Sequence, residues 1–209
     1  MSHDQNAVLQ PSVASDLTLR TALLVILLFC LVVLIFTVAG VISVPPAEQI
    51  GITRPLGSIP PHLAELAGFG LMLGGASALV YGRKGIPLVI LVPVLTVSLD
   101  LDHLPAYLGF AQPIRPAHSF VFIAVMLVIM ATTIKRPEFE LVTLSAVLGH
   151  LGIDTGLFPP FSPLSFYYAS LDPYRIAFLI GAGGAALAAG YLLRRETSPT
   201  TSTGGVSIV

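Results

Sequence analysis

The chain has 209 residues, of which 55% are hydrophobic and only 10% are charged, and its mean hydropathy is +0.89. Ordinary soluble domains carry about 25% charged residues, so lipid rather than water must cover much of this surface. The formal net charge of −1 gives no support for nucleic-acid binding, which normally needs a basic stripe. We therefore expect a polytopic membrane protein whose main partner is the lipid bilayer.

The N-terminal part of the chain divides into a tail and a first apolar segment. Residues 1–19 are polar and are expected to form a mobile tail. The segment from Thr21 to Pro45 contains no charged residue and is long enough to cross a bilayer, which takes about 20 apolar residues. Because this apolar run is longer than that of a signal peptide, and Arg20 is the only basic residue near it, we expect a retained helix.

Further apolar segments predict the rest of the fold. The sequence predicts an all-α bundle of about six transmembrane helices within residues 20–195, followed by a disordered tail from Glu196 to Val209 that is rich in Ser, Thr and Gly. Pro87 and Pro93 should bend or break the third helix. The five later segments are 63–81, 86–104, 118–134, 141–158 and 176–193.

Lysines and arginines are distributed unequally between the two sides of such a bundle. Positive residues are enriched in cytoplasmic loops, so the sequence predicts an inner (cell) membrane protein with both termini in the cytoplasm. The richer side holds Arg20, Arg83, Lys84, Lys135, Arg136, Arg194 and Arg195, and the poorer side holds Arg54, Arg115 and Arg175.

Histidines and aspartates gather on the opposite, extracytoplasmic side of this map. His150 and Asp154 are four residues apart and share a helix face, and Asp100 and His103 are three apart. Asp102 would lie on another face unless the helix unwinds there. The candidate site residues on this side are His62, Asp100, Asp102, His103, His118, His150 and Asp154.

The cost of burying these acids suggests that they bind a cation. A charged aspartate inside the bilayer costs about 2.5–3.5 kcal/mol on the insertion scale, and neighbouring carboxylates repel one another. Arg115 is the only basic side chain close to them in sequence, whereas a divalent metal would neutralise the acids and bind the imidazoles. Imidazole and carboxylate ligands favour zinc, then manganese or iron, and their number allows one ion or two.

Other interpretations of these residues stay open. Each histidine could instead form a hydrogen bond between helices, and Asp100 and Asp102 could cap a helix end. Arg115 could anchor lipid headgroups, and Glu65, three residues after His62, could be a ligand or its partner. If the fifth helix began at Leu141, His150 would lie about 14 Å into the bilayer, so either that helix begins earlier or a water-filled vestibule reaches the site.

Three short motifs resemble those of the YdjM-like family of membrane-bound metal-dependent hydrolases. The resemblance covers about Pro61 to Ser165, and the family's proline before the first aspartate is replaced by Leu99. His62 matches the family's early histidine, and Pro163-Leu164-Ser165 matches a short motif that follows the last box. The boxes are Ser98-Leu99-Asp100-Leu101-Asp102-His103, Arg115-Pro116-Ala117-His118-Ser119 and Gly149-His150-Leu151-Gly152-Ile153-Asp154-Thr155.

The resemblance implies a hydrolase. The family is similar in ligand order to zinc-dependent phospholipase C and the S1/P1 nucleases, which implies phosphoester chemistry on a lipid or lipid-linked substrate at the outer leaflet. Asp100 or Asp102 would accept a proton from water, and Arg115 would hold an anionic oxygen of the substrate. The alternatives are a metal- or proton-coupled transporter and a non-enzymatic membrane protein with a structural metal.

Overall fold

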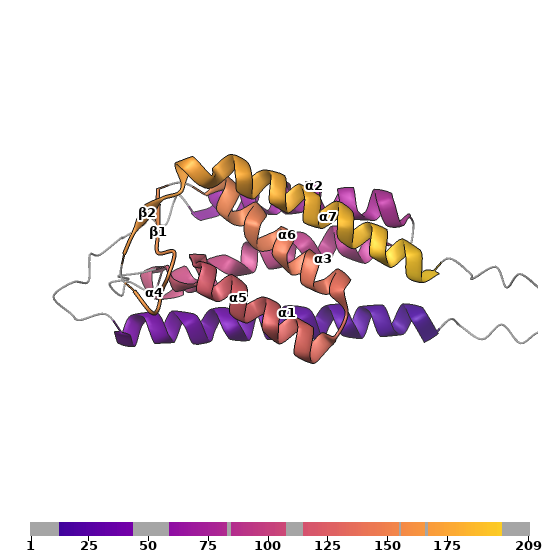
Figure 1. Cartoon of the computed structure of the whole chain (residues 1–209), viewed down its shortest axis with the longest axis horizontal. Coiled ribbons are helices and arrows are strands. Elements are labelled where there is room, and N and C mark those ends of the chain that lie inside the picture. Colours follow the sequence, from indigo (N-terminus) through magenta and orange to yellow (C-terminus); the bar gives the residue numbers. More distant parts are fainter. Residues whose placement is uncertain are drawn as a thin grey trace, which may run out of the picture.

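The computed structural model describes residues 13–43, 59–82, 85–107, 115–154, 156–165 and 167–197. Within these ranges the fold is all-α, as predicted, apart from a two-residue antiparallel pairing of β1 (Leu157–Phe158) with β2 (Ala169–Ser170). The longer helices lie side by side along the long axis of the molecule (Figure 1). They are α1 (Val13–Ser43), α2 (Ile59–Tyr81), α3 (Ile86–Ser98), α5 (Phe120–Ile129), α6 (Pro137–Ile153) and α7 (Arg175–Thr197).

Short turns join these helices at several points. A 3-10 turn, η4, and a one-turn helix, α4, continue the path of α3, and the 3-10 turn η5 precedes α5. A π-helical turn, η6, ends α5. The bounds are η4 (Leu99–His103), α4 (Leu104–Tyr107), η5 (Pro116–His118), η6 (Met130–Ile134) and η7 (Asp172–Tyr174).

Within the described ranges, four helices are long and apolar enough to cross a membrane, whereas the sequence predicted about six. The stretch Phe120–Ile134 is apolar but shorter. Helix α6 has only 17 residues, with Glu138 and Glu140 in its first turn. The four candidate spans are Leu19–Ser43, Pro61–Tyr81, Ile86–Ala106 and Asp172–Arg195.

The ends of α6 differ from those predicted, and both differences matter for the site. The helix begins at Pro137 rather than Leu141, so His150 lies about 20 Å from its start, near the far end. An earlier start, the first of the two alternatives, therefore accounts for its depth. The helix ends at Ile153 rather than 158 because Asp154 has extended backbone angles. Gly156 then takes a φ of +96°, which favours glycine.

The third helix is continuous through both of its prolines. Pro87 lies in the first turn of α3, where its missing N–H has no helical partner to lose. Pro93 lies inside the helix, which nevertheless continues to Ser98 before tightening into η4. The sequence predicted that the two prolines would bend or break this helix, and neither position breaks it.

Basic residues gather at one end of the bundle. The start of α1 and the end of α7 lie at the same end of the molecule in Figure 1. Arg20, Arg194 and Arg195 are near these two helix ends, and Lys135 and Arg136 lie between η6 and α6. Helix α1 begins at Val13, inside the segment 1–19 predicted as a tail, and α7 runs to Thr197, just inside the tail predicted from Glu196. Residues 1–12 and 198–209 lie outside the described residues.

Small residues let the helices approach closely around an apolar core. Phe122 packs edge-to-face between Phe29 and Phe36, with ring centroids 5.7 and 5.3 Å apart. A Cβ on Gly190 of α7 would lie 2.5 Å from the carbonyl oxygen of Ser77 on α2. The Ser77 hydroxyl also donates a 2.8 Å hydrogen bond to the carbonyl of Ala186. The α2–α7 contact therefore depends on glycine at position 190.

Gly190→Ala should destabilise the bundle because its methyl group would push α7 away from the backbone of α2. Overpacking of this kind costs about 1–3 kcal/mol. Thermal unfolding of the purified protein in detergent measures it. Gly183→Ala on the same helix is the matched control, since its Cβ would meet nothing within 4 Å. Equal unfolding midpoints for the two variants would contradict the packing argument.

Candidate metal centre

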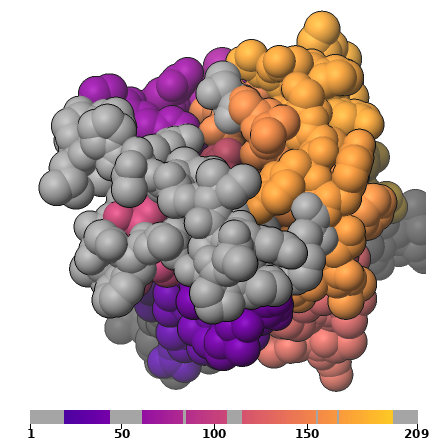
Figure 2. All heavy atoms as spheres, turned by 90° about the vertical axis from the view of Figure 1, so that its left-hand side faces the viewer, coloured from indigo at the N-terminus to yellow at the C-terminus, as the bar shows by residue number. Residues whose placement is uncertain are grey.

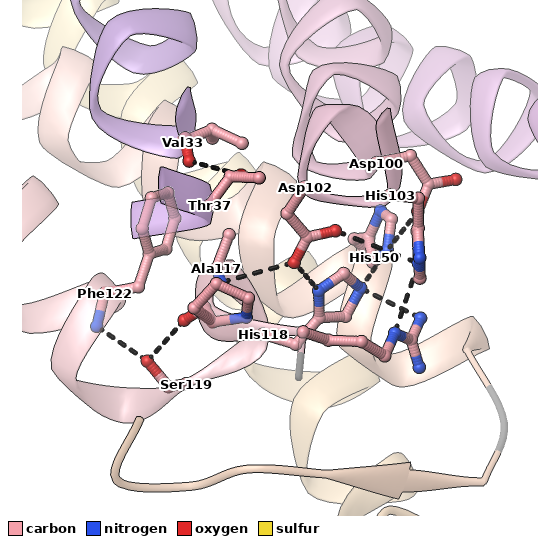
Figure 3. Close-up of polar contacts among 12 residues, drawn as sticks. Val33, Thr37, Asp100, Asp102, His103, Ala117, His118, Ser119, Phe122 and His150 are labelled. Atoms are coloured by element: carbon pink, nitrogen blue, oxygen red, sulfur yellow. Dashed lines mark hydrogen bonds and ion pairs between the residues drawn. The ribbon is translucent and has the colours of Figure 1, made fainter. Parts of the chain in front are cut away.

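Four parts of the chain bring their polar side chains together at one end of the bundle. η4 supplies three of them, η5 supplies His118, the end of α6 supplies His150 and Asp154, and the start of α2 supplies His62. Asp102, His103, His118 and His150 point toward one another in Figure 3. All seven predicted site residues thus meet in space, and six of them are buried. The exposed fractions are 0% for Asp102, His118 and His150, 1% for Asp154, 3% for Asp100 and 4% for His103.

The 3-10 geometry of η4 explains how neighbouring residues reach one site. In a 3-10 helix, side chains three apart eclipse each other, which places Asp100 and His103 on the same side. Their nearest atoms, Asp100 Oδ1 and His103 Nε2, are 3.4 Å apart. Asp102 Oδ1 lies 3.8 Å from the same His103 nitrogen. The sequence indicated that Asp102 could join only if the helix unwound there, whereas the helix instead tightens into a 3-10 turn that brings Asp102 into the cluster.

Asp100 lies at the centre of the imidazoles. Its Oδ2 is 3.4 Å from His62 Nε2, and its Oδ1 is 3.6 Å from His150 Nε2. Neither Asp100 oxygen has a hydrogen-bond partner among the described residues, although both are buried. A buried carboxylate without donors is costly, so Asp100 is poised to bind a cation. Glu65, in contrast, is exposed and belongs to neither of the two groups of possible metal ligands described next.

Two groups of ligand atoms can be distinguished, and they share His118. Within each group the ligand atoms lie within 4.8 Å of one another. The first group is Asp100, Asp102, His103 and His118, and the second is His118, His150 and Asp154.

Hydrogen bonds at the outer ring nitrogens of His118 and His150 favour one tautomer of each ring. His118 Nδ1 lies 2.9 Å from Asp102 Oδ2, and His150 Nδ1 lies 2.8 Å from the carbonyl oxygen of Thr96. A carbonyl and an ionised carboxylate can only accept, so in the neutral rings each Nδ1 carries the proton and each Nε2 carries a lone pair. The two Nε2 atoms face each other at 2.9 Å. Such a contact needs a positive charge at the nitrogens, either a proton between them or a cation beside them.

Most of the distances among these atoms are close to those at a metal site, although the 2.9 Å between His118 Nε2 and His150 Nε2 is shorter. Two ligands each about 2.0–2.1 Å from a tetrahedral zinc ion lie about 3.3–3.4 Å apart. The separations around Asp100 are 3.4, 3.4 and 3.6 Å, and His118 Nε2 is 3.5 Å from Asp154 Oδ2. Histidines whose second nitrogen donates to a carboxylate or a backbone carbonyl are typical of metal sites. Buried imidazoles and carboxylates here could therefore hold a metal ion.

Arg115 is part of the same cluster. Its side chain is buried, and its Nη2 forms an ion pair with Asp154 Oδ2. The same Nη2 lies 3.0 Å from His118 Nε2, and Nε donates to His103 Nε2 at 3.2 Å. Since a guanidinium can only donate, these contacts agree with lone pairs on both imidazole Nε2 atoms.

Ser119 is a connecting residue that the sequence reasoning did not single out. Its hydroxyl accepts a 3.1 Å hydrogen bond from the N–H of Phe122 and so caps α5. It also lies 2.8 Å from the carbonyl of Pro116 and 2.9 Å from that of Ser162. The residue thus ties η5, which carries His118, to α5 and to the segment 156–165. Its place beside His118 in the second motif was the available signal.

The segment around β1 and β2 lies beside the site end of the bundle. The N–H of Phe120 donates to the carbonyl of Pro160 at 2.9 Å, which holds the segment against the start of α5. Seen from this end, the segment and the start of α7 form the orange part of the surface, beside α1 and α2 (Figure 2). Several of its apolar side chains are exposed: Leu157, Phe161, Leu164, Tyr167 and Tyr174.

Comparisons with protein-family models, with curated proteins and with solved structures find no match to this chain. The resemblance to the YdjM-like family therefore stays a prediction that rests on the three motifs and His62.

Ser119→Ala should lower the stability of the site end, because α5 loses its cap and η5 loses its link to Ser162. Loss of a serine cap costs about 0.5–2 kcal/mol. Ser119→Thr keeps the hydroxyl and serves as the control. The unfolding midpoint in detergent is the measurement, and an alanine variant as stable as the threonine variant would refute the capping role.

Proposed function

We propose that this chain is an integral membrane metal-dependent hydrolase acting on a phosphoester or lipid-linked substrate. The observation that carries the proposal is the group of buried imidazole Nε2 atoms and carboxylates, in which His118 Nε2 and His150 Nε2 lie 2.9 Å apart and both lie near acid oxygens. A divalent cation would neutralise the acids and bind the imidazoles. Zinc is the first candidate ion, with manganese or iron as alternatives.

The residues would divide the work as follows. Asp100, His103, His118 and His150 would hold the ion, with His62 and Asp154 at its edge. Asp102 would hold His118 in the required tautomer, as the carbonyl of Thr96 does for His150. A bound divalent metal lowers the pKa of its water toward about 7 and polarises an ester oxygen.

Asp100 would also take part in proton transfer, and Arg115 would bind the substrate. Asp100 has two oxygens without hydrogen bonds, so one can bind the ion while the other accepts a proton from water. Asp102 is less suited to this role because its Oδ2 already contacts His118 Nδ1 and the N–H of Ala117. Arg115 would hold an anionic substrate oxygen, since its guanidinium lies among the ligands and presents parallel donors.

A lipid or lipid-linked substrate is supported by where the site lies. The cluster is at one end of helices that are long and apolar enough to cross a membrane. Exposed apolar and aromatic side chains surround that end, among them Phe161, Leu164 and Tyr167. Aromatic side chains favour the membrane–water interface, so the site would lie close to lipid headgroups.

The transporter alternative gains one observation from the structure. Glu138, at the basic end of the bundle, is fully buried and pairs with Arg136. An ion pathway would need acids at both ends. A metal requirement for hydrolysis distinguishes the two functions.

Zn²⁺ should raise the unfolding midpoint of the metal-depleted wild-type chain, because an ion that binds only the folded state stabilises it. Asp100→Asn should abolish this rise and the bound zinc, since Asp100 is central to the ligands. Asp172→Asn, which changes an exposed acid outside the cluster, is the matched control. Zinc retained in full by the Asp100 variant would refute the assignment.

The same three proteins should then be compared on a panel of phosphoesters and phospholipids. Wild type and Asp172→Asn should hydrolyse at least one substrate, and a chelator should remove that activity. Asp100→Asn should have none. Hydrolysis equal in all three proteins, and insensitive to the chelator, would exclude a metal-dependent mechanism.

Membrane orientation is a separate prediction. In a chain with Cys30→Ser, the variant Leu164→Cys should react with an impermeant thiol reagent added outside intact cells, because Leu164 is 79% exposed at the site end. Lys135→Cys, exposed at the basic end, should react only after the membrane is opened. The reverse pattern would overturn the predicted topology.

A further inference from the structure

Glycines bring the backbones of α2 and α3 into direct contact. A Cβ on Gly70 of α2 would lie 2.4 Å from the Cα of Pro93 on α3, and a Cβ on Gly74 would lie 2.5 Å from the carbonyl oxygen of Leu88. Both contacted atoms belong to the backbone, so no side-chain rotation can make room for a methyl group. The contacted position on α3 moves forward as the position on α2 moves back, so the two helices run antiparallel.

The same helix pair brings His62 to Asp100 at the site. His62 precedes Gly70 by eight residues, and Asp100 follows Pro93 by seven. In an antiparallel pair these equal steps lead to facing positions, and His62 Nε2 does lie 3.4 Å from Asp100 Oδ2. The two side chains therefore meet about 10–12 Å along the helices from the contact between Gly70 and Pro93.

The α3–η4 side of this pair is tied to the rest of the cluster. His150 Nδ1 lies 2.8 Å from the carbonyl oxygen of Thr96 on α3, and the N–H of Ala117 donates to Asp102 Oδ2 on η4 at 3.3 Å. His62, whose side chain is 16% exposed, is the one candidate ligand that α2 contributes. A shift of α2 against α3 would therefore move His62 and leave the other candidate ligands in place.

We propose that Gly70 is a positioning residue of the metal centre, because its contact with Pro93 sets the distance between α2 and α3 that holds His62 beside Asp100. The inference rests on the proposed metal centre and adds how its outermost ligand is held. A methyl group at position 70 would push α2 away from α3, and His62 would move away from the ion by about the width of the clash.

Zinc affinity of the metal-depleted, detergent-purified chain tests this, measured by competition with a chelator of known affinity. Gly70→Ala should raise the Kd for Zn²⁺ on the order of tenfold, the range seen when the support of a metal ligand is lost. Gly68→Ala is the matched control: it is the same substitution on the same helix, but its Cβ would meet nothing within 4 Å. Its Kd should equal that of wild type.

Two further variants separate positioning from loss of stability. If Gly70 acts through His62, Gly70→Ala should leave the Kd unchanged in a chain that already carries His62→Ala. Gly190→Ala disturbs the α2–α7 contact far from His62, so it should lower the unfolding midpoint and leave the Kd unchanged. A purely structural role for Gly70 would instead give the same change in Kd with and without His62.

The outcomes distinguish this inference from the metal centre itself. Wild-type protein that binds no zinc would overturn both. Equal Kd values for Gly70→Ala and Gly68→Ala would overturn the inference alone. So would a His62→Ala variant that binds zinc as tightly as wild type, and this result needs no change in the packing of α2. If Gly70→Ala does not fold, Gly74→Ala takes its place, since it meets the same backbone one turn farther from the site.

Discussion

The site depends on one electrostatic constraint: three carboxylates are buried together with only one guanidinium among them. Everything around them serves to hold this charge in place. Backbone atoms of Thr96 and Ala117 and the side chain of Asp102 orient the imidazoles, so that their lone pairs face inward. An apolar core packed around Phe122 surrounds them with groups that cannot compensate the charge. Burial thus turns an ordinary set of polar residues into groups that could hold a metal ion.

The positions of these residues in the chain were predictable to a large extent. Lysines and arginines divided the segments into two sides, and His62, His103, His118 and His150 fell on the same side. In the structure these residues do lie at one end of the bundle. This part of the prediction succeeded because the cost of burying charge acts on each residue separately and leaves a pattern in composition and order.

Local geometry was less predictable. Apolar runs mark where helices lie but not where they tighten, so the sequence did not predict the 3-10 turn of η4 that includes Asp102. The predicted end of α6 lies five residues beyond the observed one. The reason is that Leu157 and Phe158 continue the apolar pattern, although they form β1. The ion pair between Arg115 and Asp154 joins residues far apart in sequence, and no spacing rule contains that contact. The hydrogen bond of the Ser119 hydroxyl to the carbonyl of Ser162 depends on tertiary structure in the same way.

The short helical stretch Phe120–Ile134 has a consequence for the surrounding lipid. At 1.5 Å per residue it rises about 22 Å, whereas the hydrocarbon core of a bilayer is about 30 Å thick. If it faces lipid, this hydrophobic mismatch would make the bilayer thin locally beside α5. Headgroups would then sink toward the start of α5, where His118 lies, and a lipid could present its polar group to the cluster without leaving its leaflet.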